Sequence, residues 1–365
     1  MRKWITTALA LAPLAALVFT AFVLASAGSA KVTLPYAGSA QAASKWTFGT
    51  GDLVDSSPNI DGSSVYIGSD DDNVYKLNLS TGAVQWTFTA GDNIQSKPAV
   101  DNGVVFFGSD DNNVYAVNAS DGSIVWQYAT GGDVDANPLV VNGVVYIGSL
   151  DDNLYALDEA TGALLWNTDL GSEVFASAAS KGDGLVYANS AFDGVYALDA
   201  TTGAVVWNYA VSCGFPGCIG TSSPRVFGKT VYVGLGPNVL ALRANDGTIV
   251  WSLQTGATVW STPRYDNGFV YVGSEDDNLY SINATSGKVK WKTNLGGDVD
   301  SSPLVAHSMV WAGSNSGQFF GLQLSNGRIK FSKKTGGIVY ASPAAKGQQV
   351  LIASEDAKVY SFQMP

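Results

Sequence analysis

A motif that recurs about every forty residues constrains this chain more than any other feature. Large aromatic residues open successive copies at spacings of 40, 40, 40, 41, 44, 40 and 40 residues: Trp46, Trp86, Trp126, Trp166, Trp207, Trp251, Trp291 and Phe331. Each copy alternates four short runs rich in Val, Tyr, Ile and Leu with turn clusters, which in the third copy read GGD, NG, LDDN and ATG. Four strands joined by hairpins at this period predict one blade of a β-propeller per copy.

The two ends of the repeat region predict how the ring closes. The last copy stops after its third strand, at 359–362, whereas residues 45–48 form a fourth strand with no blade before them. We therefore predict an all-β fold over residues 46–365: an eight-bladed β-propeller of four-stranded antiparallel blades, with the N-terminal strand completing the last blade. This closure removes two sheet edges that would otherwise be exposed.

The copies resemble the PQQ-like, or quinoprotein-type, repeat. The sequences GSLDDNLYALDEATGALLW, GSDDNNVYAVNASDGSIVW and NSAFDGVYALDATTGAVVW carry this resemblance, which extends over residues 46–365. The family includes PQQ-dependent dehydrogenases and noncatalytic propellers of the BamB type, and the size of this chain is closest to the latter. The resemblance implies that the repeated tryptophans dock neighbouring blades: Trp46, Trp86, Trp126, Trp166, Trp207, Trp251 and Trp291.

The N-terminal segment reads as an export signal. Residues 1–30 begin with two basic residues, Arg2 and Lys3, and continue without a charge from Ile5 to Ala27. This pattern is typical of a signal peptide, but the apolar run is also long enough for an N-terminal membrane anchor. Residues 31–45 read as a linker. In either case the charge pattern predicts that the remaining chain is extracytoplasmic: periplasmic, on the cell surface or secreted.

Acidic residues concentrate in two sets of loops. The chain has 31 acidic and 20 basic residues, so a surface that tracks nucleic-acid phosphates is excluded. The loops that link blades and those between strands two and three hold 21 of the 31 carboxylates, and both sets should lie on one face. Asp suits tight turns, but the charges could also attract cations or a basic partner. The predicted acidic face comprises Asp71, Asp72, Asp111, Asp152, Asp276 and Asp277.

A second aligned set is predicted to line the central funnel. It stands three residues before the repeated proline and mixes carboxylates, an amide and aromatic rings, while the next position is always Ser or Ala. Such a mixture at a channel mouth is the best small-ligand site that the sequence offers. With an arginine expected deeper in the funnel, the predicted ligand-binding residues are Asp55, Gln95, Asp135, Phe175, Trp260, Arg264, Asp300 and Tyr340.

The two cysteines, the single histidine and the three glycosylation sequons do not indicate a catalytic site. Cys213 and Cys218 flank GFPG in the one long insertion, and in an exported protein they predict a disulfide. His307, the single histidine, is expected to be an exposed turn residue. Three glycosylation sequons occupy one place in the repeat, where the turn itself favours Asp or Asn: they begin at Asn78, Asn118 and Asn283.

Two functions of different classes follow. The first is an exported noncatalytic scaffold in the envelope or extracellular space, which binds a protein partner or ligand through the acidic face or funnel and needs no cofactor. No aligned position supplies a catalytic base, nucleophile or metal triad, so no catalytic residue is assigned. The second, implied by the resemblance, is a PQQ- and Ca²⁺-dependent oxidoreductase acting on alcohols or sugars. Its roles would fall on Gln95, Asp135, Trp260, Arg264 and Asp300, with the metal ligands unknown.

Overall fold

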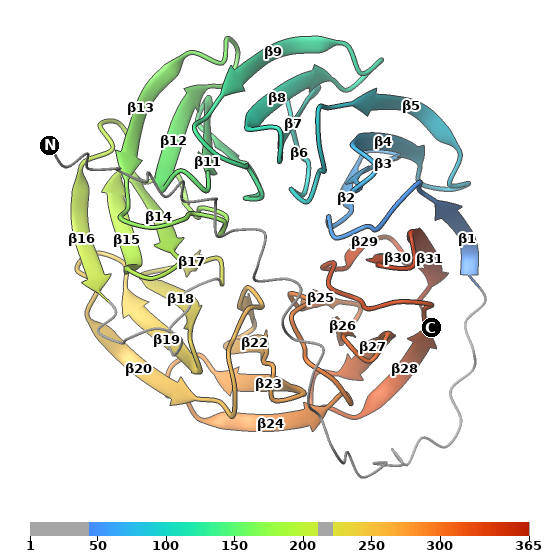
Figure 1. Ribbon diagram of the computed structural model, residues 1–365. Helices are drawn as coiled ribbons and strands as arrows, with labels where there is room; N and C mark the ends of the chain where they lie inside the picture. Colours follow the sequence, from blue (N-terminus) through green and yellow to red (C-terminus); the bar gives the residue numbers. More distant parts are fainter. Residues whose placement is uncertain (1–43, 211–221, 365) are drawn as a thin grey trace, which may run out of the picture. The chain divides into compact units, whose positions relative to one another are not determined.

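The computed structural model describes residues 44–210 and 222–364, which form a ring of eight antiparallel sheets (Figure 1). Seven sheets have four strands and the sheet of blade four has three. In each four-stranded sheet the strands pair in the order of the chain, except where the first strand of the chain joins the last sheet. The predicted eight-bladed propeller is therefore confirmed.

The strand bounds follow the repeat. Blade one contains β2 (Asn59–Asp61), β3 (Ser64–Gly68), β4 (Asn73–Asn78) and β5 (Val84–Thr89). Blade two contains β6 (Ala99–Asp101), β7 (Val104–Ser109), β8 (Asn113–Asn118) and β9 (Ile124–Ala129). Blade three contains β10 (Leu139–Val141), β11 (Val144–Gly148), β12 (Asn153–Asp158) and β13 (Leu164–Asp169). Blade four contains β14 (Leu185–Ser190), β15 (Gly194–Asp199) and β16 (Val205–Ala210).

The second half of the ring repeats the pattern. Blade five contains β17 (Arg225–Phe227), β18 (Thr230–Leu235), β19 (Asn238–Arg243) and β20 (Ile249–Gln254). Blade six contains β21 (Arg264–Asp266), β22 (Phe269–Gly273), β23 (Asn278–Asn283) and β24 (Val289–Asn294). Blade seven contains β25 (Leu304–Ala306), β26 (Met309–Ser314), β27 (Gln318–Gln323) and β28 (Ile329–Lys334). Blade eight contains β29 (Ala344–Lys346), β30 (Gln349–Ser354), β31 (Lys358–Gln363) and β1 (Ser44–Gly49).

The ring closes through the first strand of the chain. β1 pairs antiparallel with β31, with Trp46 opposite Ser361 and Phe48 opposite Val359, so the last sheet has the order β1-β31-β30-β29. On the inner side of the ring, β2 contacts β29, which joins blade one to blade eight a second time. The closure expected from residues 45–48 is confirmed, because the N-terminal strand supplies the missing edge of blade eight.

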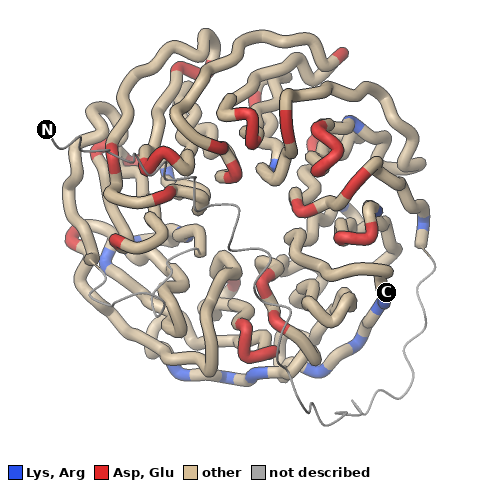
Figure 2. Tube along the Cα trace, in the orientation of Figure 1, with Lys and Arg blue, Asp and Glu red and all other residues tan. Residues whose placement is uncertain are grey.

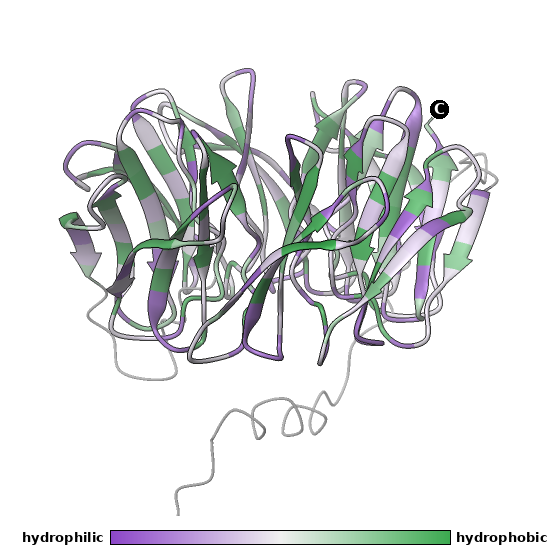
Figure 3. Cartoon of the chain, turned by 90° about the horizontal axis from the view of Figure 1, so that it is seen from above, coloured by the Kyte–Doolittle hydropathy of each residue, from purple (hydrophilic) through white to green (hydrophobic). Residues whose placement is uncertain are grey.

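Apolar residues pack between neighbouring blades. Seen from the side, the strands run between the two faces of the ring, with hydrophobic positions gathered along their length and hydrophilic ones at the turns (Figure 3). One cluster, for example, joins Trp126 of β9 to Val145 and Ile147 of β11. No helix long and apolar enough to cross a membrane occurs within 44–210 and 222–364.

The repeated tryptophan is fixed by the next blade. Trp126 is only 7% exposed, and its indole Nε1 donates a hydrogen bond to the carbonyl oxygen of Glu159 at 2.9 Å. The ring lies against Gly162, where an added Cβ would stand 2.6 Å from the indole Cδ2. The other repeated tryptophans make the same Nε1 bond to the following blade. A flat side chain with one N–H donor thus fills the wedge between two twisted sheets.

Replacing Gly162 by Ala should therefore destabilise the ring more than the same change at Gly143. Both glycines have positive φ, of 70° and 79°, so each variant loses about 1–2 kcal/mol from the left-handed backbone. Nothing lies within 4 Å of a Cβ at Gly143, whereas at Gly162 the indole must move, at a further cost of about 1–3 kcal/mol. Urea unfolding of the two variants measures the difference. Equal losses would contradict this account of docking.

Side chains next to the repeated proline link the blades around the hub. The backbone N–H of Ser342 donates to Ser57 Oγ at 2.8 Å, across the junction between blades eight and one. The N–H of Lys97 donates to Asn137 Oδ1 at 2.6 Å, and the N–H of Ser177 donates to Ser223 Oγ at 2.9 Å. The side chains two residues before the proline are small and fully buried, as at Ser56, Ser96 and Ser222. These bonds fix the inner segments of neighbouring blades relative to one another, and these segments carry the candidate site.

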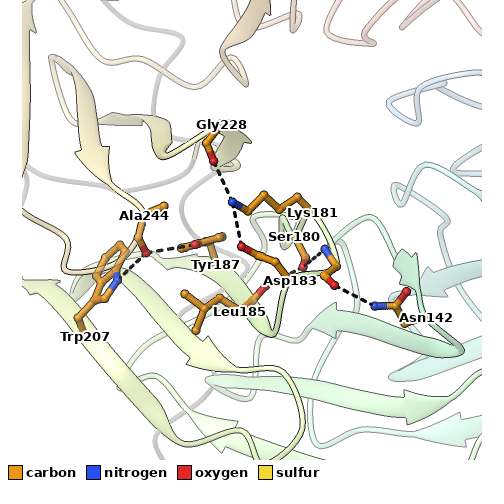
Figure 4. Close-up of polar contacts among 10 residues, drawn as sticks. Asn142, Ser180, Lys181, Asp183, Leu185, Tyr187, Trp207, Gly228 and Ala244 are labelled. Carbon is orange, nitrogen blue, oxygen red and sulfur yellow. Dashed lines mark hydrogen bonds and ion pairs between the residues drawn. The ribbon is translucent and has the colours of Figure 1, made fainter.

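Blade four departs from the repeat where alanine replaces proline. Its first strand is reduced to an isolated bridge between Ala179 and Tyr187. Polar contacts stabilise this region instead (Figure 4): Lys181 Nζ lies 2.8 Å from Asp183 Oδ2 and donates to the carbonyl oxygen of Gly228 at 2.9 Å. Lys181 therefore connects blade four to blade five.

The remaining sequence predictions fall on turns or outside the described residues. Cys213 and Cys218, the signal or anchor segment and most of the linker are not among residues 44–210 and 222–364. His307 is exposed in the turn between β25 and β26, and its Nε2 contacts the carbonyl oxygen of Gly347. The sequon residues serve their own turns; Asn78 Oδ1, for example, accepts from the N–H of Ser80 at 3.0 Å.

Candidate functional site

The loops that link blades lie beside the loops between strands two and three. The N–H of Gly51 donates to Asp71 Oδ2 at 2.6 Å, and the hydroxyl of Tyr75 donates to the same oxygen at 2.7 Å. The second oxygen of Asp71 accepts from the N–H of Asn73 at 3.2 Å. The two bonds to Oδ2 recur at Asp111, Asp151, Asp276 and Asp356. The bond to the second oxygen recurs at Asp111, Asp151 and Asp276, whereas Oδ1 of Asp356 has no partner.

These bonds give the predicted acidic face a structural part. Asp71, Asp111 and Asp276 each hold a turn to the neighbouring loop. The residues that follow Asp71, Asp151 and Asp276 adopt positive φ, of 66° at Asp72, 72° at Asp152 and 67° at Asp277, a conformation that Asp and Asn tolerate. The loop geometry therefore explains why Asp recurs at these positions, and the use of this face for binding stays a prediction.

Closer to the axis, two columns of side chains meet. The first column is the predicted set of residues that stand three positions before the proline. Each residue of the second column lies fifteen positions after its partner in the first, in the loop between strands two and three. Trp260 Nε1 donates to Glu275 Oε1 at 2.9 Å, and Asn315 Nδ2 donates to Asp300 Oδ2 at 2.8 Å. Figure 2 shows acidic positions gathered toward the inner part of the ring, whereas basic positions follow the outer strands β24 and β28. We define the acidic hub as Asp55, Asp70, Asp110, Asp135, Asp300 and Glu355.

One part of the acidic hub lies where blade eight meets blade one. Burial and the neighbouring charges of Asp55, Asp52 and Glu355 raise the pKa of Asp70 to about 7. Burial and the charge of Asp55 raise the pKa of Glu355 to about 7. Burial also raises the pKa of Asp55 itself. Three carboxyl groups therefore share this region with no cation among their perturbing neighbours.

A second part lies between blades two and three. Gln95 Nε2 donates to Asp110 Oδ2 at 3.3 Å. Burial raises the pKa of Asp110, and the charge of the nearby Asp135 carboxylate raises it further. Asp133 adds to the crowding of negative charge. An approaching cation would relieve the repulsion between these carboxyl groups.

The third part adds aromatic rings. Burial raises the pKa of Asp300 to about 7, partly offset by the bond from Asn315. Burial, and then Asp300, Glu355 and Asp55, raise the pKa of Tyr340 to about 12, so this tyrosine lies among the acidic groups of blades one, seven and eight. The side chains of Tyr340 and Trp260 are 41% and 36% exposed. Exposed aromatic faces beside carboxylates suit a bound cation.

The structure does not gather all eight predicted funnel residues into one set. Asp55, Asp300 and Tyr340 lie close together across blades one, seven and eight, whereas Gln95 and Asp135 belong to the group in blades two and three. Phe175 of blade four is partly buried, and its phenyl ring has no polar atom that could bond to either group. Arg264 is not among the charges that shift the pKa of the hub carboxyl groups. Its charge acts instead on two other cations, Lys97 and Arg225.

The hub fits the calcium and PQQ of the alternative function only in part. Asp300 Oδ1 and Asn315 Oδ1 are buried without a hydrogen-bond partner, and such oxygens are the ligands that Ca²⁺ prefers. However, residues 44–210 and 222–364 contain no group of three or more His, Cys, Asp or Glu placed to hold a metal ion. Gln95 and Trp260 also belong to opposite blades, two and six. The residues do not fit the complete cofactor set, and we derive no catalytic step through it.

The repeated sheets and the blade-docking tryptophans define the class: a PQQ-like β-propeller with an acidic hub. The chain belongs to the family described as outer membrane protein assembly factor BamB, which matches residues 37–137, 129–261 and 238–364. No curated protein matches the chain.

Solved structures with the same fold are of several kinds. BamB from Moraxella catarrhalis superposes with a TM-score of 0.76 at 17% identity, over 88% of this chain and 100% of that chain. A europium-containing methanol dehydrogenase gives 0.76 at 14% identity, over 88% of this chain and 93% of that chain. The computationally designed Ika8 protein gives 0.77 at 14% identity, over 87% and 98%. At these identities the likeness shows the fold alone.

Proposed function

We propose that this protein is an exported, noncatalytic propeller that binds a basic group of a protein partner at the acidic hub. One observation carries the proposal: five hub carboxylates each keep a buried oxygen without a hydrogen-bond partner, namely Asp55, Asp70, Asp110, Asp135 and Asp300. Buried polar atoms in proteins are normally bonded, so these oxygens call for a donor from outside the chain. A lysine or arginine side chain supplies both donors and positive charge.

The surroundings of these oxygens favour a cation over a neutral ligand. Repulsion and burial keep several hub carboxyls partly protonated near neutral pH, as at Asp70 and Asp300. A bound cation restores their preference for the charged form, so its binding is coupled to proton release. Trp260 and Tyr340 offer apolar faces for the stem of a long basic side chain.

Family membership supports an envelope role. The family is described as an outer membrane protein assembly factor, and assembly of proteins requires contact with them. The sequence pattern of residues 1–30 supports export by a cleaved signal or a retained anchor. We therefore place the protein outside the cytoplasm, at the envelope or in the extracellular space.

The test is titration calorimetry with a blocked tri-lysine peptide at low salt and pH 8. The double variant Asp110→Asn/Asp135→Asn should weaken binding at least about tenfold, since each removes a charge facing the ligand. Asp61→Asn/Asp101→Asn is the matched control, because Asp61 and Asp101 are exposed carboxylates at the ends of β2 and β6 and the change in net charge is the same. Equal affinity of the hub variant and the control would overturn the proposal.

The quinoprotein alternative has its own test. The similarity of the fold to that of a methanol dehydrogenase is the reason to test this alternative. Purified protein incubated with PQQ and Ca²⁺ should show neither a quinone absorption band nor dye-linked oxidation of alcohols and sugars. If the wild type shows turnover and Asp300→Asn does not, the protein is an oxidoreductase and the scaffold proposal is wrong.

A further inference from the structure

Basic residues gather on the outer side of three neighbouring blades. The strands β24, β28 and β1, which are the outer strands of blades six, seven and eight, carry lysines. The outer strands of blades one to five, β5, β9, β13, β16 and β20, contain neither Lys nor Arg. Figure 2 shows the basic positions along one side of the ring. We define the basic rim as Lys45, Lys288, Lys290, Lys292, Arg328, Lys330, Lys333 and Lys334; all but Lys333 are exposed.

The basic rim has no acidic counterpart. Residues 44–49 and 288–294 contain no Asp or Glu, and neither does the segment 301–354, which covers blade seven and the first two strands of blade eight. All 31 Asp and Glu residues of the chain lie within the described residues, where the ion pairs are Lys181 with Asp183 and Lys358 with Asp356. No side-chain carboxylate therefore pairs with the basic rim, although the net charge of the chain is −11.

Two lysines of the basic rim are supported by neutral rings. Lys290 Nζ lies 4.1 Å from the centre of the Phe269 ring, and Lys292 Nζ lies 5.6 Å from the centre of the Tyr280 ring. Both lysines are exposed. Such contacts hold the apolar stem of a lysine along the sheet and leave the charge of its ammonium group without a counter-ion. The basic rim is therefore open to an anionic surface from outside the chain.

The chain enters the ring at the basic rim. The strand β1 begins at Ser44, next to Lys45, and follows directly on residues 1–43. In that segment the run from Ile5 to Ala27 carries no charge and is long enough to cross a bilayer. Residues 28–43 span at most about 50–60 Å, even at full extension. A chain that keeps this segment as an anchor thus holds β1 and the basic rim near the membrane surface.

We propose that the basic rim docks the propeller onto a bilayer surface that carries anionic phospholipid headgroups. Anionic lipids attract clusters of Lys and Arg close to the surface, and such a cluster adds to the membrane attachment given by an apolar anchor. Lysines spread over three blades suit an extended surface of headgroup phosphates better than one small anion. The acidic hub lies toward the axis, away from these outer strands, so its use by a partner is independent of this docking.

Partition of the full chain into phospholipid vesicles at low ionic strength tests the proposal. The probes are vesicles of phosphatidylcholine alone and vesicles of phosphatidylcholine mixed equally with phosphatidylglycerol. The net charge of −11 alone would weaken binding to the anionic vesicles, so a preference for them has the opposite sign. We expect the wild type to bind the mixed vesicles at least about tenfold more tightly than the neutral ones, with the preference falling as salt is added.

A charge-matched pair of variants separates the basic rim from net charge and from the N-terminal segment. Lys330→Gln/Lys334→Gln, both exposed on β28, should reduce the preference for anionic vesicles at least about tenfold, since each lysine near such a surface contributes about fivefold. Lys229→Gln/Arg243→Gln removes two exposed basic residues of blade five and should leave the preference within about threefold. Equal losses in the two double variants would overturn the proposal.

Two further outcomes are decisive. Asp110→Asn/Asp135→Asn should keep at least the wild-type preference for anionic vesicles, so failure of the acidic-hub proposal would leave this one standing. Wild-type binding that is no tighter to the mixed vesicles than to the neutral ones would refute docking on anionic lipid. Self-association of the wild type that is lost in Lys330→Gln/Lys334→Gln, without a preference for anionic vesicles, would assign the basic rim to a second copy of the chain instead.

Discussion

Deletion of residues 44–49 is expected to abolish cooperative folding of the whole ring. These residues form β1, which supplies the outer strand of blade eight and the tryptophan that docks it to blade one. Trp46 is 8% exposed, and its Nε1 donates to the carbonyl oxygen of Leu79 at 2.9 Å. Its apolar cluster includes Val65 of blade one and Trp311 of blade seven, so the loss reaches beyond one sheet.

The expected size of this effect follows from burial. Removing one buried tryptophan costs about 3–5 kcal/mol, and domains are stable by about 5–15 kcal/mol. The deletion also leaves β31 with an unpaired edge. Circular dichroism and limited proteolysis measure the outcome, and Trp46→Phe, which keeps most of the packing, is the matched control. A cooperative melt near that of the wild type, with cleavage confined to blade eight, would show that closure is dispensable.

The second large effect is a fall in stability as the pH rises from about 5 to 8. The pKa values of Asp70, Asp300 and Glu355 are raised to about 7 in the folded protein, whereas unfolded carboxyl groups titrate near 4. Between these values the folded state binds more protons than the unfolded state. The free energy of unfolding therefore decreases with pH across this window and is highest on its acidic side. After allowance for solvent screening, the fall is on the order of a few kcal/mol.

Thermal unfolding across this pH range measures the prediction. The variant Asp70→Asn/Asp300→Asn/Glu355→Gln should show a flatter profile and be more stable than the wild type at pH 8, because its amides need no proton. Asp61→Asn should keep the wild-type slope. A stability that rises from pH 5 to 8 in the wild type would contradict the electrostatic description of the acidic hub.

The fold could be predicted from the sequence because each copy of the repeat contains the strand and turn residues of one blade. Tryptophan spacing and turn residues depend on neighbours within about forty residues, and eight copies make the pattern unmistakable. The closure by residues 45–48 joins the two ends of the chain, and it was predicted because the last copy lacks its fourth strand. The exception is blade four, where Ala178 replaces proline and the first strand shrinks to the bridge at Ala179. Proline helps to fix the backbone at the other blades, but its absence from blade four was not used to predict a shorter first strand.

The site was predicted less completely because it joins columns from different loops. The first column was visible at Asp55 and Asp300, but its partners, such as Asp70 and Asn315, were assigned to the loops between strands two and three and were not paired with it. A search at an offset of fifteen residues would have found the pairing.

A crystal structure of the protein with the blocked tri-lysine peptide tests the central claim most directly. We expect one lysine ammonium group within hydrogen-bond distance of the orphaned carboxylate oxygens of Asp55, Asp135 or Asp300, with its stem against Trp260 or Tyr340. A peptide that lies on the outer strands or on the opposite face, with the hub carboxylates untouched, would contradict the assignment of the acidic hub as the binding site.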